Sequence, residues 1–201
     1  IIIHAQKNYI YGKMAEKAYN AASLITGDSL IIQNKGYLVG AKKQNNIIIQ
    51  NGVDTKIFFE KNNNFKKRYN MEKDEILIFS PRAITPLYNI DVIIESLNLL
   101  KLNNYKFKCM FSFAFGGEYS KKLREKVSKL NLEKNIIWLG YIDYAEMAKY
   151  YNASDIVVSI PSSDSSPKSV YEAMFCKKAI IISNLEWSYE ILPEDNVVVR
   201  V

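Results

Sequence analysis

Two carboxylates, Asp164 and Glu172, lie in a segment that runs from a polar loop into a predicted helix. An apolar run at 155–160 comes directly before the loop, so the order is buried strand, loop and helix. The first turn of a helix exposes backbone N–H groups and the positive end of the helix dipole, and both attract phosphate oxygens. The segment therefore predicts an anion site with acceptors on both sides, which suits a sugar linked to a phosphate.

Small and basic side chains around the helix start complete this predicted site. Ser166 is expected to cap the helix, with Pro167 at its first position. Asp164 is expected to accept hydrogen bonds from sugar hydroxyls, and Glu172 to reach a ribose diol. The alternative is a capped core helix on which Glu172 is exposed. The residues predicted to contact the ligand here are Ser165, Ser166, Lys168 and Ser169.

Arg82 follows a second apolar run at 76–79, which predicts another buried strand. In open parallel sheets, ligands bind beyond the carboxyl ends of the strands, so the guanidinium is expected to face the same cleft. Its planar fork can bind two oxygens of a diphosphate at once. The alternative is a surface arginine paired with a helix carboxylate.

Two further strand ends carry weaker signals. Gly116 and Gly117 would let the backbone approach a ligand closely, although a glycine pair is also an ordinary tight turn. Gly140 and Tyr141 could present backbone groups and a ring to a nucleotide base. The alternative for Tyr141 is a packing aromatic, since the chain has 14 tyrosines.

The elements that must position these residues alternate from residue 75 onward. Apolar runs predict strands at 76–79, 106–115, 136–139, 155–160, 179–183 and 196–201. Helical spacing predicts helices at 90–100, 119–130, 144–152 and 167–177. Apolar strands separated by helices are typical of an α/β, Rossmann-like, doubly wound parallel sheet covered on both faces.

The first part of the chain is expected to be a partial N-terminal segment. It contains helix-like stretches at 13–23 and 29–37 and short strands at 24–26 and 47–49. We expect a boundary near residue 45, because residues 1–45 are too few for their own core, and a main domain at 46–201. The abrupt apolar start resembles a strand cut at its beginning, so we expect a longer protein.

The amino-acid composition limits the kinds of ligand and surface that the chain is expected to bind. The 201 residues include 27 basic and 21 acidic side chains, a net charge of +6 that favours anionic ligands without indicating nucleic acid. The basic stretch at 121–129 predicts a solvated helix face, with contact to a membrane surface as the alternative. No apolar run approaches the ~20 residues that span a bilayer.

The sequence gives little support for a metal site or for a nucleophilic catalytic residue. His4 is the only histidine, and no Cys/His metal spacing, Walker-type loop or dinucleotide-binding glycine motif is present. Cys109 and Cys176 lie in apolar surroundings, which predicts free thiols in a reducing cytosol. Cys176 is expected to be a packed helix residue.

Several segments follow one another in the order of a known family. They are Asn51-Gly52-Val53-Asp54 with Phe58, Ser80-Pro81-Arg82 with Asn89-Ile90-Asp91, Trp138-Leu139-Gly140, Tyr150–Asp155, and Asp164–Met174 with its Glu-x7-Glu-like spacing. Over about residues 13–201 the sequence resembles the donor-binding half of retaining GT-B glycosyltransferases. These form the glycogen-synthase-like and mannosyltransferase-like group, glycosyltransferase family 4.

Two departures from the family pattern bear on the phosphate site. Asp164 stands where the family has Glu, and Leu87 and Tyr88 stand where it has Lys and Gly. One expected diphosphate contact is therefore missing. Arg82 and the helix N-terminus, with Lys168, are expected to carry more of the charge.

The resemblance implies a function for the whole site. Arg82 would hold the diphosphate and stabilise the leaving group, Asp164 would orient the donor sugar, and Glu172 would bind the ribose. The donor would be a nucleotide diphosphate sugar such as a UDP- or GDP-sugar, with no cofactor and no metal; the absence of an Asp-x-Asp motif agrees with this.

Transfer would retain configuration and deliver the sugar to a glycan or lipid-linked acceptor. An N-terminal domain, of which residues 1–45 would be the remnant or the linker, would hold that acceptor. The resemblance implies polysaccharide biosynthesis in the cytoplasm or at the inner face of the membrane. Residues 1–201 alone are expected to bind the donor but to transfer sugar poorly.

Other interpretations remain open at this point. The chain could be a non-catalytic sugar-nucleotide-binding or interaction subunit that needs a separate partner; exposed apolar residues in 1–45 would favour this. A nucleotide-sugar epimerase should need more acid–base groups in the cleft. A response-regulator-like domain should have an acidic cluster at a strand end.

Overall fold

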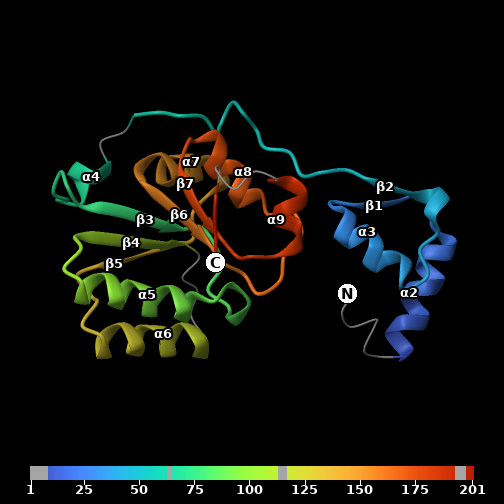
Figure 1. Cartoon of the computed structure of the whole chain (residues 1–201), viewed down its shortest axis with the longest axis horizontal. Coiled ribbons are helices and arrows are strands. Elements are labelled where there is room, and N and C mark those ends of the chain that lie inside the picture. The colour runs from blue at the N-terminus through green and yellow to red at the C-terminus, as the bar shows by residue number, and fades with distance from the viewer. Residues whose placement is uncertain (1–8, 63–64, 113–116, 193–197) are drawn as a thin grey trace. The chain divides into compact units, whose positions relative to one another are not determined.

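The computed structural model describes residues 9–62, 65–112, 117–192 and 198–201 (Figure 1). The chain divides into two compact units. The small unit comprises Ile1–Gly52, Asp164–Pro167 and Leu185–Pro193, and the large unit comprises Val53–Ser163, Lys168–Asn184 and Glu194–Val201.

The large unit is built on a six-stranded parallel sheet, as the apolar runs predicted. Its strand order is β5-β4-β3-β6-β7-β8, and neighbouring strands are parallel throughout. The strands are β3 (Ile76–Ser80), β4 (Phe107–Ser112), β5 (Ile136–Gly140), β6 (Ile156–Ser159), β7 (Ala179–Ile182) and β8 (Val199–Arg200).

The chain enters this sheet in the middle and reverses direction once. From β3 it moves outward to β5, returns to pair β6 with β3, and then continues to β8. The boundary between β3 and β6 is therefore a topological switch point, the position at which open α/β sheets bind ligands. Arg82 follows β3, and the predicted phosphate loop follows β6.

Helices cover both faces of the sheet. Figure 1 shows α5 (Ile90–Leu102) and α6 (Glu118–Lys129) on one face and α7 (Tyr144–Ala153) and α8 (Lys168–Phe175) on the other. The short helix α4 (Phe65–Arg68) and the 3-10 turn η2 (Pro86–Tyr88) also belong to this unit. Because both faces are covered, β3 and β4 are buried along most of their length, which explains their continuous apolar sequence.

The core between the sheet, α5 and α6 follows from helical spacing. Ile90, Ile93, Ile94 and Leu97 recur at intervals of three and four residues and bury one stripe of α5. They join strand side chains and residues of α6 in one cluster, which includes Ile78, Cys109, Phe111, Val158, Leu123 and Val127.

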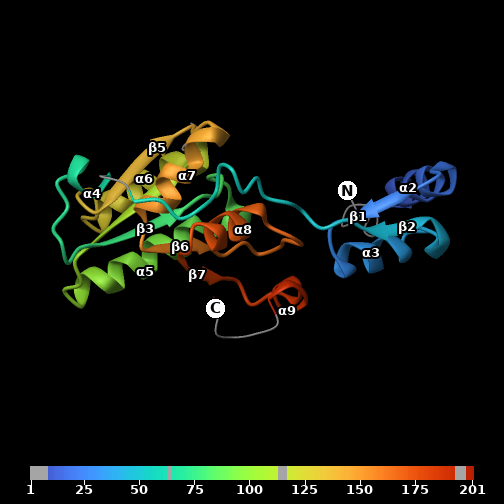
Figure 2. The ribbon, with the colours of Figure 1, turned by 90° about the horizontal axis from the view of Figure 1, so that it is seen from above.

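The small unit contains a parallel pair of strands and three helices among its described residues. These elements are α2 (Tyr9–Ala21), β1 (Ile25–Gly27), α3 (Leu30–Tyr37), the 3-10 turn η1 (Lys43–Asn45), β2 (Asn46–Ile48) and α9 (Glu186–Ile191). β1 and β2 lie side by side (Figure 2). Ser29 caps α3 by accepting from the Ile32 amide at 3.3 Å.

Helix α9 was not predicted from the sequence. Its six residues make fewer than two turns, so no helical period can be recognised in them. Trp187 is buried, and Glu190 Oε1 accepts from the Leu30 amide at 2.8 Å at the start of α3. Contacts with α3, far away in sequence, therefore stabilise this helix.

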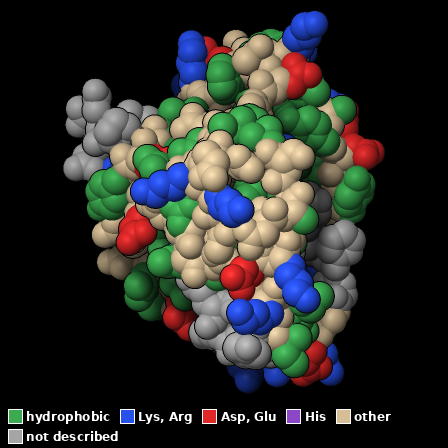
Figure 3. Space-filling view, turned by 90° about the vertical axis from the view of Figure 1, so that its right-hand side faces the viewer, with side chains coloured by type: hydrophobic (Ala, Val, Ile, Leu, Met, Phe, Trp, Pro, Cys, Tyr) green, Lys and Arg blue, Asp and Glu red, His purple; other side chains and the backbone are tan. Residues whose placement is uncertain are grey.

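The small unit leaves a series of apolar side chains exposed. Figure 3 shows hydrophobic side chains on one face of the molecule, among basic and acidic ones. In the small unit the exposed ones include Ile10, Tyr11, Met14, Leu24, Leu30 and Leu38. Among the described residues, no helix is both long and apolar enough to cross a bilayer.

Candidate active site

Arg82 is held beside the first turn of α8. Its Nη1 donates to Oγ of Ser169 at 3.0 Å, and its guanidinium carbon lies 4.3 Å from the centroid of the Tyr88 ring. Ser169 is buried, whereas Arg82 is half-buried. The loop after β3 and the start of α8 therefore meet at the switch point, while the ligand contact expected of Arg82 stays a prediction.

Glu172 is buried rather than exposed. Only 5% of its surface is accessible, and Oε2 accepts a hydrogen bond of 2.7 Å from the Tyr151 hydroxyl. Burial raises the pKa of Glu172, while the Tyr151 hydrogen bond and the charges of Lys168 and Arg82 lower it. The interpretation of Glu172 as an exposed residue of a capped helix is therefore wrong.

The spacing along α8 explains this grouping. Ser169 and Glu172 are three residues apart and Lys168 and Glu172 four apart, so all three project from neighbouring positions of the helix. Lys168 is exposed in the first turn. The large unit thus gathers two cations, a buried carboxylate and a hydroxyl at the carboxyl end of its sheet.

Tyr151 is the residue that the sequence analysis missed here. It is fully buried in α7, and burial together with the adjacent Glu172 carboxylate raises its pKa well above the usual value. Phe58 and Phe79 pack against its ring at centroid distances of 5.8 Å and 5.2 Å. One of 14 tyrosines offers no distinguishing signal in the sequence, so only the fold identifies it.

Asp164, Ser165 and Ser166 belong to the small unit. The Ser165 amide donates to Oδ1 of the preceding residue, Asp164, at 2.9 Å. The Ser165 hydroxyl donates to Asp28 Oδ2 at 2.9 Å, and Asn51 Nδ2 donates to the Ser166 carbonyl at 2.8 Å. Asp28, which the sequence analysis did not single out, therefore orients this loop segment.

The glycines at the other strand ends are partly described. Gly117 and Gly140 have φ values of +126° and +74°, and a Cβ built on either would meet no atom within 4 Å. Both positions favour glycine for backbone reasons and leave room for a ligand. Tyr141 is 66% exposed, and its hydroxyl donates to Asp143 at 3.4 Å. Gly116 and His4 lie outside the described residues.

The described part of the chain shows no group of three metal-ligating side chains. Both cysteines are free and buried. Burial raises the pKa of Cys109, and it raises that of Cys176 to about 11. Neither thiol is poised as a nucleophile, in line with the prediction that Cys176 is a packing residue.

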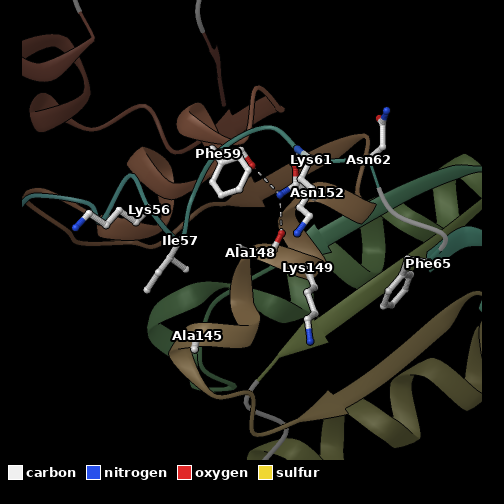
Figure 4. A pocket seen from close by; sticks show the side chains of 10 residues that line it. All are labelled: Lys56, Ile57, Phe59, Lys61, Asn62, Phe65, Ala145, Ala148, Lys149 and Asn152. Carbon is white, nitrogen blue, oxygen red and sulfur yellow. Dashed lines mark hydrogen bonds between the residues drawn. The ribbon is translucent and has the colours of Figure 1, made fainter.

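A pocket of about 690 Å³ lies elsewhere in the large unit (Figure 4). None of the predicted site residues lines it. The lining residues are Lys56, Ile57, Phe59, Lys61, Asn62 and Phe65, with Ala145, Ala148, Lys149 and Asn152 of α7. Asn152 holds its wall together, because its Nδ2 donates to the carbonyls of Phe59 and Ala148 and its Oδ1 accepts from the Lys61 amide.

One sequence family and several solved structures match this chain. The family described as Glycosyl transferases group 1 matches residues 60–197. No curated protein matches the sequence. HepE from Anabaena, solved in complex with UDP and glucose, has 16% identity and a TM-score of 0.83, with 96% of this chain and 53% of that chain covered.

Two further solved structures are also similar to this chain. Sucrose-phosphate synthase from Thermosynechococcus elongatus has 18% identity and a TM-score of 0.79, with 98% of this chain and 50% of that chain covered. The C-terminal domain of the group 1 family glycosyl transferase LpcC from Francisella tularensis has 27% identity and a TM-score of 0.60, with 75% and 80% covered.

These likenesses establish the fold. The six-stranded sheet of the large unit is the Rossmann-like half of a GT-B fold, as the sequence predicted. This chain spans about half the length of HepE and of sucrose-phosphate synthase.

Proposed function

This chain belongs to the group 1 glycosyl transferases, and on that premise we propose that it binds the nucleotide diphosphate sugar from which a sugar is transferred. The observation that carries the proposal is the grouping of Arg82, Ser169 and Glu172 at the switch point of the large unit, with Lys168 acting on the same carboxylate. Ligands of open α/β sheets bind at this position.

Each group has a proposed part in the reaction. The guanidinium of Arg82 binds two oxygens of the diphosphate and stabilises the negative charge that develops on it as the sugar departs. Lys168 and the N–H groups that start α8 add positive potential. Glu172 accepts hydrogen bonds from the ribose diol, and Asp164 orients the donor sugar.

The finer features of the reaction extend this proposal. Charge stabilisation by an arginine, a lysine and a helix N-terminus needs no metal ion and no acid–base histidine, so we infer metal-independent transfer. The resemblance to glycosyltransferase family 4 supports retained configuration and a glycan or lipid-linked acceptor. HepE was solved with UDP and with UDP-glucose, which supports a nucleoside diphosphate as the leaving group.

Calorimetric titration with UDP-, GDP- and ADP-sugars tests the donor site. At least one donor should bind, and Arg82→Ala and Glu172→Ala should each weaken it. Arg124→Ala is the matched control, because Arg124 also stacks on an aromatic ring, that of Trp138, but lies on α6. Absence of binding to every donor, or equal losses in all three variants, would contradict the proposal.

The second candidate is a donor-binding subunit that acts only with a partner. The exposed apolar side chains of the small unit favour a protein surface that another domain covers. In this case 201 residues alone should bind the donor but transfer little sugar, and mixing with an acceptor-binding domain should restore transfer. Full turnover by the isolated chain would exclude this candidate.

A further inference from the structure

The turn after β3 differs from the family pattern where the diphosphate is expected. Leu87 and Tyr88 occupy the positions of the usual Lys and Gly. Leu87 is 43% exposed and contributes no charge. The diphosphate site of this chain therefore relies on Arg82 more heavily than a site with a second cation in this turn.

Tyr88 constrains the guanidinium of Arg82. The ring centroid lies 4.3 Å from Cζ, so the guanidinium lies over the aromatic face. Ser169 Oγ accepts from Nη1 at 3.0 Å and limits rotation of the guanidinium. The ring contact and the hydrogen bond together restrict the orientation of the fork.

The turn that carries Tyr88 is itself anchored. The Leu87 carbonyl accepts from the Ser162 amide at 2.9 Å, and Asn89 Nδ2 donates to the Ile160 carbonyl at 2.8 Å. Asn89 adopts a left-handed conformation with φ of 49°, which turns the chain into α5. The loop after β6 therefore fixes the position of the aromatic ring that stacks on Arg82.

We propose that Tyr88 is a positioning residue that holds the Arg82 guanidinium ready for the diphosphate of the donor. The inference rests on the proposed function and deepens it. A guanidinium fixed before binding loses less side-chain entropy when the diphosphate arrives. By holding Arg82 in place with its ring, Tyr88 offsets part of the affinity that a second cation in this turn would supply.

The test compares two ligands that differ only in phosphate number. For each variant, calorimetry gives the ratio of the dissociation constants of the nucleoside monophosphate and the nucleoside diphosphate. Tyr88→Leu and Tyr88→Met, two apolar replacements without a ring, should each lower this ratio roughly three- to tenfold. Tyr88→Phe keeps the ring face and should restore it.

These measurements distinguish a role of Tyr88 in positioning Arg82 from a role in packing alone. A purely structural role of the half-buried Tyr88 would weaken both ligands equally and leave the ratio unchanged, and thermal unfolding of each variant reports its folding. Tyr88→Leu should also have no further effect on the ratio in the Arg82→Ala background.

An unchanged ratio in folded Tyr88→Leu and Tyr88→Met, with a lowered ratio in Arg82→Ala, would overturn the positioning role while the proposed function stands. No nucleotide binding by the unaltered chain, or an unchanged ratio in Arg82→Ala, would overturn the proposed function and this inference with it.

Discussion

The Tyr151 hydroxyl donates to Oε2 of Glu172 at 2.7 Å, and both side chains are buried in the large unit. The bond joins α7 to α8 and fixes one oxygen of the carboxylate. Burial raises the pKa of Glu172, so this group is harder to ionise than an exposed glutamate, and the Tyr151 hydroxyl partly offsets that cost. The predictions about Glu172 follow from this pair.

Tyr151→Phe should weaken ribonucleotide binding about tenfold. A hydrogen bond to a charged group contributes about 1.5–3 kcal/mol, and its loss leaves the carboxylate less fixed and less readily ionised. The measurement is the dissociation constant of a nucleoside diphosphate and of its 2′,3′-dideoxy analogue, which lacks the diol. Only the ribonucleotide should respond.

Tyr150→Phe is the matched control for this prediction. The Tyr150 ring packs against Phe65 and Phe79, so its replacement keeps a similar aromatic environment on the same helix. If Tyr151→Phe weakened binding of the dideoxy analogue as much as binding of the ribonucleotide, Tyr151 would not act through the ribose contact.

Donor binding should strengthen as the pH rises through the raised pKa of Glu172. The ribose hydroxyls donate hydrogen bonds and therefore favour the ionised carboxylate over the protonated one. The affinity for a nucleotide sugar, whose diphosphate does not titrate in this range, should fall as the solution is acidified from neutral pH. In Glu172→Gln the affinity should be lower and should not follow this titration; a pH profile identical to that of the unaltered chain would argue against the ribose role.

Glu172→Gln should become more stable relative to the unaltered chain as the pH rises from about 4 to about 8. Burial raises the pKa of Glu172 in the folded state, so the folded chain holds this proton more tightly than the unfolded chain does. The resulting stabilisation is fully present when the pH is below the unfolded pKa. That contribution is lost as the pH rises through the folded pKa. Glutamine does not titrate and can still accept from Tyr151. Urea unfolding of both proteins across this pH range gives the difference in the free energy of unfolding.

Glu60→Gln should show the opposite trend. The hydrogen bond and charge of Lys177 lower the pKa of this exposed glutamate, so its contribution to stability is lost as the pH falls. Because the pair is exposed, the change should be small and should shrink in high salt. If the stability of both variants, relative to the unaltered chain, changed in the same direction with pH, the raised pKa of Glu172 would be contradicted.

Asn152→Ala should lower the free energy of unfolding by about 2–3 kcal/mol. The side chain makes four hydrogen bonds, to the Phe59 and Ala148 carbonyls, to Cys176 Sγ and from the Lys61 amide. Those with Phe59 and Lys61 attach residues 59–61 to α7. Asn103→Ala is the control, because Asn103 makes one exposed bond to the Leu99 carbonyl. Urea unfolding should distinguish the two; equal losses would show that Asn152 does not hold the segment.

The sequence predicted most elements and their order because each depends on neighbours along the chain. The apolar stripe of α5 and the continuous apolar runs of β3 and β6 are local patterns with a known period. Helix α9 was missed because α3, distant in sequence, stabilises it. The division of the chain at residue 45 stays a prediction. So do the ligand contacts of all the candidate site residues: Arg82, Gly116, Gly117, Gly140, Tyr141, Asp164, Ser165, Ser166, Lys168, Ser169 and Glu172.

The sequence by itself determined the order of strands, loops and helices, and it indicated that Arg82 and residues 164–172 follow strand ends. Only the tertiary structure decided which residues hold them in place. Ser169 meets Arg82 across 87 positions of the chain because β6 returns to pair with β3. Tyr151 meets Glu172 across 21 positions because α7 packs beside α8. Such contacts depend on the order of strands in the sheet, which no local period of the sequence encodes.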